Sequence, residues 1–440
     1  MKINKYLILI YTISFASFMV NLDTYVVNVA LPSITQTFKA STSDISWIVM
    51  SYNLMVVSLL LIFGKLGDTI GLKKLFNIGF IIFTSSSLMC GLSNSVLILV
   101  ISRLTQGIGA SILYALPQAM IAKYLPKEHR GTAFGVLASA AALGITLGAP
   151  VSGFITEFLS WRWIFFINVP VGILSVIFLN YSINNSFFKK NKLNQFDSIG
   201  AILSFICSLT LTLYINRGVS FGWFSVKMLS LALISLISFI LFINRALKIE
   251  YPLINLNLFK KLNFDFANIA MFLASSYLAA TNFLIPFYLN KILNFSLPKI
   301  GILFTCYSVS YMLTSLISGK ISNKVSLTKI CTTSMLLLSL NLVIFSFNMK
   351  GTYIYPFFII SGITMSFFIT SNNNFVMSMA KNGEEGMVAG THRMTGRIGM
   401  LFGVALFEAF YSISLSFHKC YILGALVCFM AAIFSAIKKR

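Results

Sequence analysis

The sequence predicts an all-α integral membrane protein whose chain crosses the bilayer fourteen times. Apolar residues make up 57% of the 440 residues and charged residues only 10%, whereas about a quarter of an ordinary globular domain is charged. Apolar stretches of about twenty residues follow one another with short polar breaks between them, which is typical of spanning helices. The third observation is a charged loop that occurs twice, 255 residues apart, which indicates two related halves.

Fourteen spans are an even number, so both termini are expected on one side of the membrane. The expected spans are residues 6–31, 44–63, 75–93, 96–120, 131–156, 163–183, 197–215, 225–244, 264–289, 297–318, 328–347, 352–376, 388–411 and 418–437.

The formal net charge of +22 is distributed unevenly along the chain. Most Lys and Arg residues fall in breaks or tails that are cytoplasmic if the N-terminus is cytoplasmic. This bias follows the positive-inside rule, and it predicts a multi-pass protein of the inner or plasma membrane with both termini in the cytoplasm. No basic arm stands apart from the spans, so nucleic acid is not an expected partner.

The repeated loop runs from Gly64 to Lys74 and, in a more divergent copy, from Gly319 to Lys329. The copies follow the second and the tenth span, whereas two plain six-span halves would place them after the second and the eighth. We therefore predict a six-helix bundle at 1–188, two inserted spans with linkers at 189–260, and a second six-helix bundle at 261–440. Repeated halves of this kind are typical of secondary transporters.

Asp23 is the only acid deep inside a predicted span, and an unpaired charge there costs several kcal/mol. It lies about 12 Å below the outer end of the first span, and Arg103 lies about 10 Å below the same surface in the fourth. The two can therefore pair at one level. Pairing that depends on protonation would make a proton switch, and a static structural pair is the alternative.

The face of the first span that lines a cavity stays open. Ser14, Ser17, Asn21, Thr24 and Asn28 share one stripe of a regular helix, and Asp23 lies nearly opposite. Either the stripe lines the cavity while Asp23 points into a helix contact, or the reverse holds.

Three further features have a functional interpretation and a plain one. Asp68 in the loop can accept hydrogen bonds from the amides of a helix N-terminus and so act as a latch, or the loop is a solvated turn with surface lysines. Small residues around Pro150 in the fifth span let helix backbones approach closely at a bend made by the proline, or they are ordinary small-residue packing. Arg393 and Arg397, with His392 beside them, either reach lipid headgroups or form an inner gate.

The sequence shows no catalytic constellation, nucleotide-binding loop or metal-ligand spacing, and its six cysteines are scattered. We therefore expect neither an enzyme nor a bound cofactor or metal.

Five segments resemble motifs of the major facilitator superfamily, and specifically its branch of fourteen-span drug/proton antiporters. They are Leu22–Pro32, Gly64–Lys74, Arg103–Gly109, Gly144–Gly153 and Trp161–Pro170.

The resemblance implies the major facilitator fold, with two six-helix bundles around a central cavity, alternating access and proton-driven drug efflux. It assigns proton coupling to Asp23 and Arg103. The remaining assignments are a conformational latch at Gly64, Asp68, Gly71, Lys73 and Lys74, an antiport motif at Gly144, Gly148, Pro150 and Gly153, and cavity candidates at Asn21, Thr24, Tyr25, Asn28 and Gln106.

The function we predict from these observations is export of lipophilic cationic or neutral molecules in exchange for protons. The alternatives are a dedicated exporter or symporter of one endogenous metabolite, and a non-transporting receptor or scaffold with the same fold. The expected partners are the lipid bilayer, protons and the small-molecule substrate, and the chain is expected to be a monomer.

Overall fold

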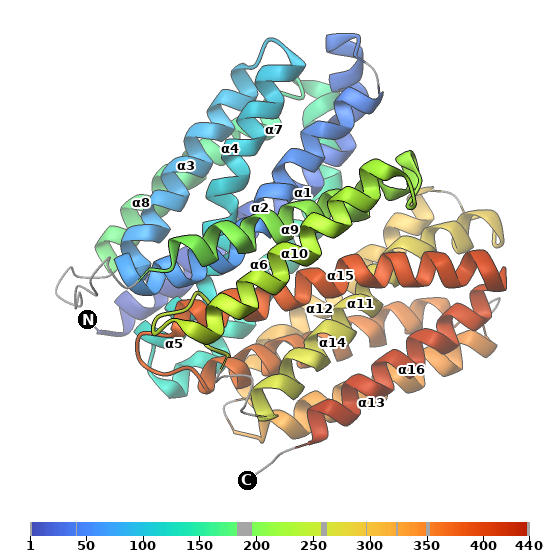
Figure 1. Cartoon of the computed structure of the whole chain (residues 1–440). Coiled ribbons are helices and arrows are strands. Elements are labelled where there is room, and N and C mark those ends of the chain that lie inside the picture. Colours follow the sequence, from blue (N-terminus) through green and yellow to red (C-terminus); the bar gives the residue numbers. More distant parts are fainter. Residues whose placement is uncertain are drawn as a thin grey trace. The chain divides into compact units, whose positions relative to one another are not determined.

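The computed structural model describes residues 2–40, 42–182, 196–256, 262–295, 297–322, 324–348 and 353–437. All regular secondary structure within these residues is helical (Figure 1). Each predicted span overlaps one helix or two consecutive helices. The bounds are α1 Lys2–Phe38, α2 Thr42–Ile70, α3 Leu72–Leu92, α4 Val96–Ala115, α5 Pro117–Tyr124, α6 Lys127–Phe158, α7 Trp163–Phe166, α8 Asn168–Ser182, α9 Ser198–Phe221, α10 Val226–Lys248, α11 Leu262–Lys291, α12 Leu297–Ile321, α13 Leu327–Phe347, α14 Ile354–Ser378, α15 Glu385–Ser414 and α16 Phe417–Ala436.

Thirteen helical segments in the described residues are long and apolar enough to cross a membrane. The thirteenth predicted span corresponds to α15, which has 30 residues but is not among those segments. It contains Arg393, Arg397 and Glu408, which lower its hydropathy. The count of fourteen spans therefore stays a prediction.

Helix boundaries follow local chemistry. Pro117 has no amide hydrogen to donate, so it ends the ladder of α4 and starts α5. The α4 helix begins after Ser95, whose hydroxyl accepts a hydrogen bond from the Ile98 amide at 3.3 Å. Gly71 separates α2 from α3 with φ 99°, a left-handed conformation that glycine adopts without steric cost.

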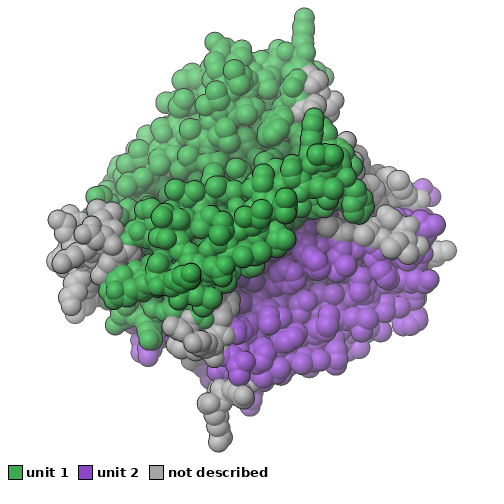
Figure 2. Space-filling view, in the orientation of Figure 1, with its two compact units in different colours: residues 1–125, 147–256, 380–391 green, residues 126–146, 257–379, 392–440 purple. Residues whose placement is uncertain are grey.

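The chain divides into two compact units, which are coloured in Figure 2. Unit 1 comprises residues 1–125, 147–256 and 380–391, and unit 2 comprises 126–146, 257–379 and 392–440. The boundaries fall inside α6 and α15, so each of these helices contributes residues to both units. The predicted bundle boundaries at 188 and 260 stay a prediction.

In unit 1, α4 packs against α2 and α3, and α8 packs against α1 and α3. The helices of the predicted insertion, α9 and α10, pack against each other, and α9 also packs against α2. Asp197 at the start of α9 ties the two together, because its Oδ1 lies 2.7 Å from Arg245 Nε of α10. The same oxygen accepts a hydrogen bond from the Gly200 amide at 2.8 Å and so caps α9.

In unit 2, α14 packs between α12 and α13, and α16 packs against α11 and α13. Its core is aromatic: the rings of Phe345 and Phe357 stack with centroids 4.0 Å apart, and Tyr421 meets Phe345 edge-on at 5.0 Å. Close packing of α12 and α14 depends on Gly362, since an added Cβ would lie 3.1 Å from the Cβ of Ser310 and closer still to the carbonyl oxygen of Tyr307.

We expect Gly362→Ala to destabilise the protein by about 1 to 3 kcal/mol, because the methyl group forces α12 and α14 apart. Gly301→Ala on α12 is the matched control, since a Cβ there meets nothing within 4 Å. Alanine improves helix propensity equally at both sites, so the control should be neutral or stabilising. A thiol-reactive dye that reports exposure of the buried cysteines Cys331 and Cys428 gives both melting temperatures. Equal melting temperatures for the two variants would contradict the packing argument.

Candidate functional site: a buried ion pair and a helix-capping carboxylate

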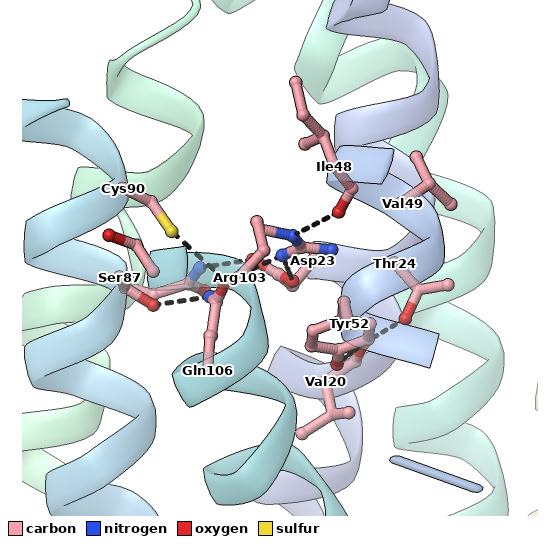
Figure 3. A network of polar contacts seen from close by, with 12 residues as sticks. Val20, Asp23, Thr24, Ile48, Val49, Tyr52, Ser87, Cys90, Arg103 and Gln106 are labelled. Carbon is pink, nitrogen blue, oxygen red and sulfur yellow. Dashed lines mark hydrogen bonds and ion pairs between the residues drawn. The ribbon is translucent and has the colours of Figure 1, made fainter. Parts of the chain in front are cut away.

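Asp23 of α1 lies in the interior of unit 1 and is only 2% exposed (Figure 3). Its Oδ2 accepts a hydrogen bond from Nη1 of Arg103 on α4 at 2.5 Å. The structure thus brings together the two residues that we expected at one depth in the membrane from their distances to the span ends. Asp23 points into the helix contact, which agrees with one half of the first arrangement that the sequence left open; that the polar stripe of α1 lines a cavity stays a prediction.

Arg103 is held by groups from α2 as well as by Asp23. Its Nε donates to the backbone carbonyl oxygen of Ile48 at 3.2 Å, and its guanidinium carbon lies 4.1 Å from the ring centroid of Tyr52. The arginine is 1% exposed. A fixed hydrogen-bonding fork above an aromatic face suits arginine and would not suit lysine.

The second oxygen of Asp23 is held by two amides. Gln106 Nε2 donates to Oδ1 at 3.0 Å, and Asn168 Nδ2 of α8 donates to the same atom at 3.1 Å. The orientation of Gln106 is fixed, because its Oε1 accepts from Arg103 at 2.7 Å and its Nε2 also donates to Ser87 Oγ of α3 at 2.7 Å (Figure 3).

Within the part of the chain that the structure describes, every hydrogen-bond partner of Asp23 is therefore an N–H donor, which matches an ionised carboxylate because that group can only accept hydrogen bonds. Protonation of Asp23 would place a new O–H donor among donors and would remove the charge that attracts Arg103. The hydrogen bonds around Asp23 are therefore complementary to the charged form of the carboxylate.

The polar stripe of α1, on the side away from Asp23, makes other contacts. Asn21 accepts a hydrogen bond from the Tyr114 hydroxyl of α4 at 2.7 Å and is 9% exposed, while Thr24 bonds to the Val20 carbonyl of its own helix. Tyr25 is 39% exposed. The side chain of Asn28 lies outside the described part of the structure. The cavity roles of these residues and of the buried Gln106 stay predictions.

Asp68, near the end of α2, caps the first turn of α15 within unit 1. Its Oδ1 accepts from the Gly386 amide at 2.7 Å and its Oδ2 accepts from the Met387 amide at 2.8 Å. These amides belong to the first turn of α15 and have no acceptor inside their own helix, and a carboxylate also complements the positive end of the helix dipole. The sequence predicted this kind of contact but not which helix would provide the amides.

Gly64 explains how α2 and α15 come close enough for this bond. An added Cβ there would lie 2.5 Å from the Gly386 carbonyl oxygen and 3.0 Å from the Gly390 Cα. Lys74 is exposed as expected of a surface loop, but the expectation fails for Lys73, which is 5% exposed. Lys73 lies in the first turn of α3, immediately after Gly71, where its backbone hydrogen-bonds with the side chain of Tyr124.

The antiport motif is only partly a packing motif here. An added Cβ on Gly148 would meet the Cβ of Tyr25 at 2.5 Å, and Ser152 Oγ donates to the Val26 carbonyl at 2.7 Å, so α6 lies close to α1 at this point. Gly144 is buried, Pro150 lies exposed inside α6, and a Cβ on Gly153 would meet nothing within 4 Å. The structure gives no packing reason for glycine at 153.

Some site residues were missed at the sequence level. Ser87 and Asn168 complete the Asp23 network, but neither lies at a spacing that ties it to Asp23.

His392 of α15 is fully buried in unit 2, with its two ring nitrogens 3.0 Å from Asn268 Oδ1 and 3.1 Å from Asn373 Oδ1. It therefore does not belong to a lipid-facing surface. Within the described ranges no three His, Cys, Asp or Glu side chains are placed to bind a metal ion.

Membrane-length helices and a buried ion pair are features that secondary transporters share. A family model described as Major Facilitator Superfamily matches residues 13–279 and 266–439, and the chain belongs to that superfamily.

The similarity extends over nearly the whole chain. The chain is 31% identical over 422 residues to the riboflavin transporter RibZ of Clostridioides difficile strain 630, and the alignment covers 94% of this chain and 90% of that protein. It is 27% identical over 412 residues to the multidrug transporter protein MdtP of Bacillus subtilis strain 168, with 93% and 76% covered. Its fold is similar to that of the human organic anion transporter MFSD10, with a TM-score of 0.71, 13% identity and 97% and 99% of the two chains covered.

These comparisons confirm the predicted fold, the superfamily and the likeness to multidrug transporters. The chain is a multi-pass membrane transporter and not an enzyme.

We expect Arg103→Lys to destabilise the protein by about 2 kcal/mol or more, because lysine keeps the charge but loses the bond to Ile48 and the planar contact with Tyr52. Arg162→Lys is the control, since Arg162 also bonds one carbonyl, that of Ser93, and lies over Trp161, yet is only half-buried. Thermal unfolding of both purified variants makes the comparison. If both lose the same stability, the Asp23 network does not depend on the arginine fork.

We expect Asp68→Asn to expose the start of α15, because asparagine offers one acceptor oxygen where aspartate offers two and lacks the charge that favours a helix N-terminus. Hydrogen exchange of the Gly386 and Met387 amides should become about fivefold faster, corresponding to loss of about one hydrogen bond. Asp197→Asn, which alters the cap of α9 instead, should leave these two amides unchanged. Unchanged exchange in Asp68→Asn would show that the helix end is held by other contacts.

Proposed function

We propose that the protein is a proton-coupled antiporter that exports lipophilic cationic or neutral molecules by alternating access. In this proposal it resides in the cell membrane with both termini in the cytoplasm. The observation that carries the proposal is the Asp23 carboxylate, which is buried in a membrane-spanning helix and whose partners among the described residues are N–H donors of Arg103, Gln106 and Asn168. Intramembrane carboxylates of this kind mark ion pathways.

In this mechanism a proton from outside neutralises Asp23 and weakens its hold on Arg103. Arg103 keeps its contacts with Ile48 and Tyr52, so the change falls on the α1–α4 contact and not on the α2–α4 contact. The two protonation states then favour different conformations, and the proton gradient biases their populations. The Asp68 bond to α15 would be one of the contacts made in a single conformation, as a latch requires.

A second candidate is a transporter dedicated to one metabolite, working as an exporter or by symport. The 31% identity to a riboflavin transporter over 94% of this chain supports it. Both candidates use the same switch at Asp23, and they differ in substrate range.

Inside-out vesicles with an imposed proton gradient test the coupling. We expect a transported compound to dissipate the gradient with the wild-type protein. Asp23→Asn should abolish the proton flux, because the asparagine amide does not take up a proton near neutral pH. Asp197→Asn is the matched control, because Asp197 also pairs with an arginine, Arg245, but lies outside the network, and it should remain coupled.

The panel of compounds should include the planar cation ethidium, neutral lipophilic dyes and riboflavin. Dissipation by many of these compounds indicates a broad exporter, and dissipation by one indicates a dedicated transporter. Coupled transport in Asp23→Asn would overturn the proposed switch.

A further inference from the structure

The three side chains that donate hydrogen bonds to Asp23 differ in whether they can also accept one. Arg103 cannot, because a guanidinium group carries only N–H donors. Gln106 and Asn168 end in amides, which have a donor side and an acceptor side, and a half-turn of the amide exchanges the two sides without changing its shape. A protonated Asp23 would need an acceptor for its new O–H, and a reversed amide would provide one.

Gln106 is locked in one orientation by its other partners (Figure 3). Its Oε1 accepts from Nη1 of Arg103 at 2.7 Å, and its Nε2 donates to Ser87 Oγ at 2.7 Å as well as to Asp23 at 3.0 Å. Reversal would turn the amide nitrogen toward the guanidinium, so that two donors would face each other. Since Gln106 is fully buried, the bonds lost in this way would leave unsatisfied polar groups.

Asn168 has no such constraint. Its Nδ2 donates to Asp23 Oδ1 at 3.1 Å, and within the described ranges this is the one hydrogen bond that its side-chain amide makes. The residue is 2% exposed and lies at the start of α8. Reversal of this amide would give up only the bond to the charged carboxylate, and it would present Asn168 Oδ1 to an O–H on Asp23.

The position of Asn168 follows from a proline. Pro170 has no amide hydrogen to donate to the carbonyl of Phe166, four residues earlier, and its ring clashes with that carbonyl in a regular helix. The chain is interrupted here, with α7 ending at Phe166 and α8 beginning at Asn168. Because α8 packs against α1, the first residue of α8 can meet Asp23 in the interior of unit 1.

The other ionisable groups around Asp23 do not supply the acceptor. Tyr52 of α2 presents its ring to Arg103, and the thiol of Cys90 on α3 bonds to another side chain of the network. The four residues of α7 include no ionisable one, and the ionisable residue of α8, Tyr181, lies exposed at the far end of that helix. Asn168 is therefore the group best placed to answer a change of charge on Asp23.

We propose that Asn168 is a positioning residue of the proton switch, and that its side-chain amide reverses when Asp23 gains or loses a proton. The proton adds to Asp23 Oδ1, and no other bond to hydrogen forms or breaks. Asn168 then changes from a donor through Nδ2 to an acceptor through Oδ1, so both protonation states keep a hydrogen bond at this oxygen. The inference rests on the proposed function, because it concerns the carboxylate that couples protons in that transporter.

Infrared difference spectroscopy of the purified full-length protein in detergent, between acidic and alkaline buffer, tests the proposal without requiring transport. Protonation of Asp23 should give a carboxylic C=O band that is absent in Asp23→Asn. The frequency of this band rises as the carboxyl group loses hydrogen bonds. In the wild type it should be the frequency of a group whose O–H is donated. A band typical of a free O–H would overturn the proposal even if no variant of Asn168 folds.

Asn168→Leu provides the second arm, because leucine has a similar shape but neither donates nor accepts. It should shift the Asp23 band to higher frequency through the loss of the hydrogen bond from the O–H. Asn180→Leu is the matched control, since Asn180 lies on the same helix and its amide bonds with Asn77 at an exposed position. This control should leave the band where it is in the wild type.

Failure of this inference and failure of the proposed function give different spectra. An Asp23 band that appears with the wild type but does not move in Asn168→Leu overturns the role of Asn168 and leaves the switch at Asp23 in place. The absence of any band assignable to Asp23, from acidic to alkaline buffer, overturns both.

Discussion

The hydrocarbon core of a bilayer offers an ionised carboxylate no water, so Asp23 can stay charged only if the protein supplies every compensating group. Arg103 supplies the opposite charge, and Gln106 and Asn168 satisfy the second oxygen. Asp23 lies on α1 and these compensating groups come from α4 and α8, while Ser87 of α3 and Ile48 of α2 hold the donors in place. Removal of one partner from such a buried pair costs about 3 to 5 kcal/mol. The arrangement of five helices in unit 1 is thus tied to a single carboxylate.

A second constraint is close approach between helices, which both copies of the repeated loop meet in the same way. Gly64 at the end of α2 lies against Gly386 and Gly390 of α15 in unit 1. Gly319 at the end of α12 lies against Gly131 and Gly135 of α6 in unit 2, where an added Cβ would lie 3.1 Å from the Gly135 Cα.

Each loop glycine thus packs on two glycines spaced four apart at the start of a long helix, and small residues at this spacing allow backbones to meet. The two copies of the loop differ at the fourth residue after this glycine, which is Asp68 in the first copy and Asn323 in the second. Asp68 caps α15, whereas its counterpart Asn323 lies outside the described residues.

The sequence predicted the helices well because bilayer thickness fixes their length and hydropathy marks it. Depth alone was enough to match Asp23 with Arg103, since two buried charges of opposite sign have few other ways to be neutralised. Gln106 was predicted only as a cavity candidate, although its position one turn from Arg103 on the same helix is a sequence sign that it can join the ion pair. The face of α1 could not be chosen, because polar residues occur on both sides of it and only tertiary packing tells them apart. The amide partners of Asp68 could not be found either, since any helix N-terminus offers the same groups.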